Sequence, residues 1–145
     1  MLTFNQGIVE ANTINMAINT SGGGAANGTV AVGGSGILKV NGSISLVNQA
    51  GTAGSGTLVV SNGGTLVCSN NIFKTTSTGV GAVNVSDSTL ILGGTMGISN
   101  GVPVDNLNIT NATLTLSAIG VGQPDISAVN FSPDFVTTSN ISNIA

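Results

Sequence analysis

The sequence predicts an all-β fold: a right-handed parallel β-solenoid (β-helix) of about six triangular coils, each built from three short strands. Three observations lead to this prediction. A pair of apolar residues recurs every 22 to 28 residues, a second strand pattern follows each pair, and turn-forming residues separate the two. Because one such repeat cannot bury its own apolar face, stacked neighbours must form a common core. We expect residues 1–145 to form a single solenoid domain, as a fragment or a stacking subunit of a longer fibre.

The first strand of each repeat is marked by two apolar residues with one residue between them. Its six occurrences are Leu2/Phe4, Val30/Val32, Leu58/Val60, Val83/Val85, Leu107/Ile109 and Val129/Phe131. Subtracting the first members gives intervals of 28, 28, 25, 24 and 22 residues. These intervals are typical of one turn of a solenoid.

The second strand is clearest in the segments ILKV (37–40), TLVC (65–68), TLIL (89–92) and TLTL (113–116). Alternate side chains of a strand point to opposite faces, so every other residue should point inward. The predicted core ladder is Leu38, Leu66, Leu90, Leu114, Val40, Cys68, Leu92 and Leu116. A third, weaker apolar segment follows at Ile14/Met16, Ile44/Leu46, Ile72, Met96/Ile98, Ile119/Val121 and Ile141.

Turn-forming residues mark the corners between these strands. Asn62, Asp87 and Asn111 follow the first strand in three successive repeats, and residues of this type bond to local backbone and tolerate bends. We expect their side chains to form a corner ladder along the rod. The longest corner, before each new coil, is rich in glycine and other small residues, which tolerate unusual backbone angles and changes in loop length.

Several apolar residues are predicted to face outward. Val67 and Ile91 should lie side by side on one face, with Val59 and Phe73 on the other two faces. An exposed apolar patch is a usual marker of an interaction surface. Val59, Val67, Phe73 and Ile91 are therefore candidate residues of a lateral interface with another copy or with a partner, although scattered surface apolar residues would explain them equally well.

Composition argues against several functional classes. The chain has two lysines, Lys39 and Lys74, and five acidic residues, which gives a net charge of −3, and it has no histidine. Nucleic-acid binding needs clustered basic residues, and no apolar stretch has the length of a membrane helix. Without histidine or a pair of carboxylates at one site, we predict no catalytic residues, no metal site, no cofactor and no enzymatic activity.

Segments such as GSGTLVVSNGGTLVCSNN, GAVNVSDSTLILGG and DNLNITNATLTLS resemble the β-strand repeats of bacterial autotransporter passengers. That resemblance implies a parallel β-helix exported to the bacterial cell surface, where such proteins serve as adhesin stalks or filaments. Since the end coils of a solenoid present unpaired backbone groups, we expect a structural rod that stacks end to end or continues a longer one. The alternative is an adhesin segment that binds a glycan or host protein. Ice binding is a third, more distant possibility, because Thr65, Thr89 and Thr113 align across three repeats.

Overall fold

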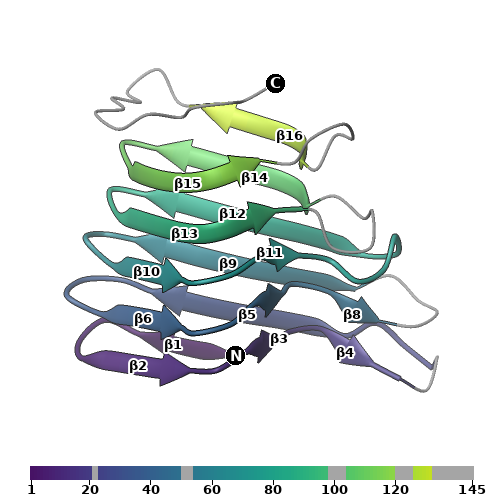
Figure 1. The fold of residues 1–145 in the computed structure, drawn as a ribbon. Helices are drawn as coiled ribbons and strands as arrows, with labels where there is room; N and C mark the ends of the chain where they lie inside the picture. Colours follow the sequence, from purple (N-terminus) through teal and green to yellow (C-terminus); the bar gives the residue numbers. More distant parts are fainter. Residues whose placement is uncertain (21–22, 50–53, 98–103, 120–125, 132–145) are drawn as a thin grey trace.

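The computed structural model describes residues 1–20, 23–49, 54–97, 104–119 and 126–131. Within these residues the chain forms sixteen β-strands and no helix, and every strand pairing is parallel. The strands stack as a parallel β-solenoid, with the chain rising one level per coil (Figure 1). The predicted fold class is confirmed.

The first face of the solenoid is a six-stranded sheet in the order β1-β5-β9-β12-β14-β16. Its strands are β1 (Leu2–Phe4), β5 (Asn27–Val32), β9 (Ser55–Ser61), β12 (Val80–Ser86), β14 (Val104–Thr110) and β16 (Ile126–Phe131). The register pairs the apolar signatures that the sequence predicts, for example Leu2 with Val30 and Val83 with Leu107. The repeat found in the sequence is therefore the coil of the structure.

The second and third faces belong to one sheet, because β13 runs through the corner between them. The strands of the second face are β2 (Ile8–Ala11), β6 (Ile37–Val40), β10 (Thr65–Cys68), the first half of β13 (Thr89–Met96) and the first half of β15 (Thr113–Ile119). The third face contains β3 (Ile14–Asn15), β7 (Ile44–Ser45), β11 (Ile72–Phe73) and the ends of β13 and β15.

About four coils lie between β1 and the end of β13, and they are described except for residues 21–22, 50–53 and the side chain of Gln49. The fifth coil is described through the backbone of β15, and β16 provides the first strand of a sixth. Six first-face strands agree with the six predicted repeats. The third-strand predictions at Ile98, Val121 and Ile141 lie outside the described residues.

A two-stranded sheet extends the first two coils beyond the predicted triangle. It pairs β4 (Ile18–Asn19) with β8 (Asn48–Gln49) in parallel. The sequence predicts only a loop here, because two-residue strands carry too few side chains to show a period. The third corner of these two coils therefore begins with a short stretch of paired strand.

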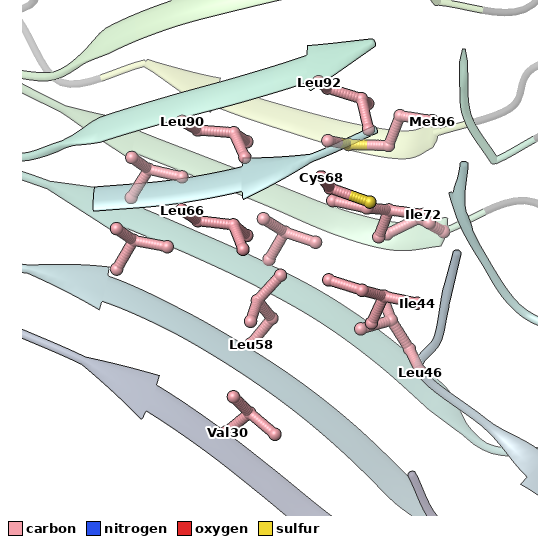
Figure 2. Close-up of a cluster of buried hydrophobic side chains, with 14 of the residues drawn as sticks. Val30, Ile44, Leu46, Leu58, Leu66, Cys68, Ile72, Leu90, Leu92 and Met96 are labelled. Atoms are coloured by element: carbon pink, nitrogen blue, oxygen red, sulfur yellow. The ribbon is translucent and has the colours of Figure 1, made fainter. Parts of the chain in front are cut away.

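The core consists of inner columns, which we define as inward side chains at the same register position in successive coils. Of the predicted core ladder, Leu38, Leu66, Leu90, Leu114, Val40, Cys68 and Leu92 are buried. Leu116 is in backbone register with Leu92, but its side chain lies outside the described set. Figure 2 shows Leu66 and Leu90 of the second face in this core together with Leu58 of the first face and Ile44 of the third. Each coil thus buries its apolar residues against its neighbours.

The corner between the first and second faces repeats one backbone conformation. Asn62, Asp87 and Asn111 have φ angles of 51°, 47° and 43°, and Gly34 has 55° at the corresponding corner of the second coil. Asparagine, aspartate and glycine tolerate this left-handed region better than other residues. The Asn111 Nδ2 donates a hydrogen bond of 2.7 Å to Asp87 Oδ1, and the backbone N–H of Asn62 donates to Ser86 O at 3.1 Å. The corner is therefore held by backbone and side-chain bonds between coils.

Candidate assembly site

The first coil presents strand edges at one end of the solenoid. Among the described residues, β1 pairs only with β5, β2 only with β6, and β3 only with β7. The outer edge of each strand therefore carries backbone N–H and C=O groups that can accept another parallel strand. This edge is the natural place for a further coil to add.

At this end of the solenoid, apolar residues of the inner columns are partly exposed to solvent. Leu2 is 38% exposed and lies in register with Val30, which is buried. Beside it opens a cavity of about 360 Å³. Its lining is mainly apolar: Met1, Leu2, Val9, Ala11, Ile14, Asn15, Met16, Ala17, Gly28, Thr29, Val30 and Leu38. The end of the first coil therefore combines an apolar hollow with open strand edges.

The inward residues of the first coil differ in size from those in register with them. In the second face, the inward residues of the first coil are Val9 and Ala11, which are in register with Leu38 and Val40. Ala11 is smaller than every described residue above it in the same column, and Val9 is smaller than the leucines above it. On the second face the first coil therefore carries smaller inward residues than the coils that follow, whereas on the first face its Leu2 and Phe4 are larger than Val30 and Val32.

The outer side of the second face carries two straight columns of side chains. One contains Ile8, Ile37, Thr65, Thr89 and Thr113, and the other contains Glu10, Lys39, Val67, Ile91 and Thr115. The outward residues of β10, β13 and β15 on this face carry no charge, because they are threonines and aliphatic residues. Each of these strands contributes one residue to each column, and we call such a pair a rung. The threonine alignment seen in the sequence is thus present in the strand register, but only one of these three rungs, Thr113 and Thr115, has threonine at both positions.

The residues predicted for a lateral interface do not form one surface. Val59 lies on the first face, Val67 and Ile91 on the second, and Phe73 on the third. Val67 and Ile91 are register partners; Ile91 is 39% exposed, whereas Val67, Val59 and Phe73 are half-buried. The structure brings together only the Val67 and Ile91 pair, so any lateral contact by these residues would centre on the second face.

Lys74 is a buried cation that the sequence pattern does not predict. Its side chain is 2% exposed and its Nζ donates hydrogen bonds to Asp105 Oδ2 at 2.7 Å and to Gly79 O at 3.0 Å. The same carboxylate oxygen accepts the backbone N–H of Gly81 at 2.6 Å. A Cβ on Gly81 would lie 2.8 Å from the Lys74 Cδ, so glycine is needed there to admit the lysine stem. The ion pair thus links the end of the third coil to the start of the fifth.

The register explains why Lys74 points inward. Ile72 pairs with Ile44, so two residues later Lys74 occupies the level of the buried Leu46. Alternation from Ile72 would have placed residue 74 in the core. The alternation was not read as an inward position because a lysine head group usually stays in water. Asp105 lies 31 residues away in the sequence, and nothing local in the sequence indicates that it is the partner.

Cys68 is a core residue, as its position in the second strand predicts. Its side chain is fully buried, and its Sγ lies 3.4 Å from the backbone oxygens of Gly42 and Asn70. Burial raises the pKa of the Cys68 thiol, which outweighs the opposite effect of nearby backbone hydrogen bonds. Because the thiolate is the reactive form, this environment makes Cys68 a poor nucleophile.

Other kinds of site have little support in the part of the chain that the structure describes. These residues contain no group of three or more histidine, cysteine, aspartate or glutamate side chains that could hold a metal ion. They also include no helix with the length and apolar character to cross a membrane.

Comparisons with known proteins return no family for this chain. No protein-family model, no curated protein and no solved structure matches it. The architecture, a parallel β-solenoid repeat protein, therefore rests on the strand order and register described above.

Proposed function

We propose that this chain is a structural unit of an extracellular rod, a bacterial surface fibre or stalk, in which the solenoid continues from coil to coil across its ends. The observation that carries the proposal is the end of the first coil, where open parallel strand edges surround an apolar hollow of about 360 Å³. The sequence resemblance to autotransporter passenger repeats supports the bacterial surface as its location. In this role the protein needs no catalytic or cofactor-binding residues.

The strand directions support end-to-end continuation. The first face is parallel throughout, with β1 and β16 as its two outer strands in the described chain. Translating one copy along the rod would bring β16 of that copy toward β1 of the next with the same strand direction. Such a head-to-tail contact does not close on itself, so it produces filaments.

The proposal is tested by electron microscopy and light scattering of the purified chain over a range of concentrations. We expect rods whose length increases with concentration. Leu2→Asp should prevent this growth, because stacking would bury the new carboxylate in an apolar column. In the unassembled chain this position is 38% exposed, so the variant should still fold. Ile8→Asp is the matched control, because Ile8 is 61% exposed on the outer side of the second face.

Two results would contradict the proposal. Persistent monomers of the unmodified chain at micromolar concentration would reject end-to-end assembly, and equal growth of both variants would place the contact elsewhere. If monomers persist and a glycan array or a host-protein panel shows binding, the adhesin alternative is favoured. Loss of that binding on Ile91→Lys would then assign it to the second face, where Val67 and Ile91 adjoin.

A further inference from the structure

The chain contains four asparagine–glycine pairs, at residues 27–28, 41–42, 62–63 and 100–101. Such pairs are chemically labile, because glycine has no side chain to keep its backbone nitrogen away from the side-chain amide of the preceding asparagine. The pair Asn62–Gly63 forms an exposed corner between β9 and β10, where Asn62 has a φ of 51° and Gly63 a φ of 89°. A chemical change at this pair would therefore act on the turn that joins the first face to the second.

Backbone hydrogen bonds to the next coil close this pair to reaction. The N–H of Gly63 donates to Asp87 O at 2.6 Å, and the N–H of Asn62 donates to Ser86 O at 3.1 Å. Attack on the asparagine amide requires the Gly63 nitrogen to give up its proton and to turn toward Asn62 Cγ. Both changes break the bond to Asp87, so the corner is unreactive while the third and fourth coils are in contact, even though Asn62 is exposed to water.

We propose that Asn62–Gly63 is a deamidation site that reacts only when the third and fourth coils separate at this corner, and that its modification marks an opened coil and hinders its closure. In the reaction, a bond forms between Gly63 N and Asn62 Cγ, and the bond from Cγ to Nδ2 breaks. The Nδ2 leaves as ammonia with the proton from Gly63 N. Water then opens the resulting succinimide to aspartate or isoaspartate, so the net reaction consumes one water and needs no other reagent. It does not depend on whether copies of the chain stack.

The packing of the corner explains why the product hinders closure. Gly63 lies between two coils: its nitrogen is bonded to Asp87 O, and a Cβ added to it would lie 3.0 Å from Gly34 O. Isoaspartate adds a methylene group to the main chain, so the corner cannot keep both contacts. Aspartate fits the backbone better, since Asp87 itself adopts a φ of 47° at the next corner. Its carboxylate would nevertheless lie beside that of Asp87, and like charges repel.

Peptide mapping by mass spectrometry measures the rate of deamidation at Asn62. We expect this rate to be at least about a hundredfold lower in the folded chain than in the urea-unfolded chain, because only the open fraction reacts. Leu66→Ala should raise the folded-state rate by at least about tenfold, since Leu66 is buried in register with Leu90 of the fourth coil and its loss favours separation. Val67→Ala, on the outer side of the same strand, is the matched control and should change the rate much less. If Leu66→Ala does not fold, the unmodified chain in urea below its unfolding midpoint provides the same comparison.

A refolding experiment tests the effect of the product. The unmodified chain and Asn62→Gly are held unfolded until their asparagine–glycine pairs have reacted, and both are then returned to native buffer. Asn62→Gly lacks this site but keeps the other three pairs, so a loss of refolding confined to the unmodified chain belongs to residue 62. We expect that loss. Unreacted Asn62→Asp should refold, which separates the added main-chain atom from the added charge.

Three results would overturn the inference. Equal deamidation rates in the folded and unfolded chains would show that the bond from Gly63 to Asp87 does not protect the site. A Leu66→Ala chain that is less stable but reacts no faster would show that the reaction does not require coil separation. Equal refolding of the reacted chain and reacted Asn62→Gly would show that the modified corner still closes.

Discussion

At the scale of single residues, the fold depends on a few positions that break the aliphatic pattern. Asn62, Asp87 and Asn111 adopt left-handed backbone angles that allow the chain to turn from the first face to the second. Lys74 forms an ion pair with Asp105, and Lys74 takes the register position that Leu46 holds in the preceding coil. The turn residues were predictable from their chemistry; the ion pair was not, because its partners are distant in the sequence and lysine is rarely buried.

Replacing Asp105 by alanine should destabilise the solenoid by about 3 kcal/mol, because the Lys74 ammonium, 2% exposed, would lose its only described carboxylate partner. The double variant Lys74→Met with Asp105→Ala should recover most of this loss, since methionine fits an aliphatic column without a charge. Urea denaturation of the two variants and the parent makes the comparison. A double variant no more stable than Asp105→Ala would contradict this account of the site.

Replacing Asn62 by valine should cost about 1–2 kcal/mol, because a β-branched residue is strained at a φ of 51°. Asn62→Gly is the control and should be close to neutral, since glycine adopts this angle freely and Gly34 occupies the equivalent corner with a φ of 55°. Thermal unfolding measures both. Equal destabilisation by valine and glycine would show that the asparagine side chain, and not its backbone angle, matters at this corner.

At the scale of elements, each strand is short and gains its stability from the coils above and below. The strand β10 shows this most clearly, because Leu66 and Cys68 are buried while Thr65 and Val67 face outward. Alternation made this division predictable from the sequence. The strand pair β4 and β8 was not predictable, because its two-residue strands are defined by pairing between coils and not by a pattern along the chain.

Leu66→Ala should therefore destabilise the protein by about 2–5 kcal/mol, since it opens a cavity between the leucines of two neighbouring coils. Val67→Ala, one residue along the same strand, should cost less than about 1 kcal/mol because its side chain is half-buried on the outer face. Chemical denaturation midpoints compare the two. Similar losses for both variants would mean that the inward and outward sides of β10 are assigned wrongly.

At the scale of the whole molecule, the described chain is a stack of coils, and its first coil exposes apolar residues of the kind that fill the interior. The repeat in the sequence predicts the stack, because the apolar signatures that define it become register partners on the first face. It does not predict the hollow at the first coil, since residues from all three faces line it and their meeting point depends on how the coil closes. Function, as proposed, depends on whether this end accepts a further coil.

The most direct test is cryo-electron microscopy of assembled rods at a resolution that separates strands. If the solenoid continues across its ends, the strand spacing of about 4.8 Å should run unbroken through each junction between subunits, with strands perpendicular to the rod axis. A gap in this spacing at the junctions, or rods whose subunits meet through the second face, would contradict the account.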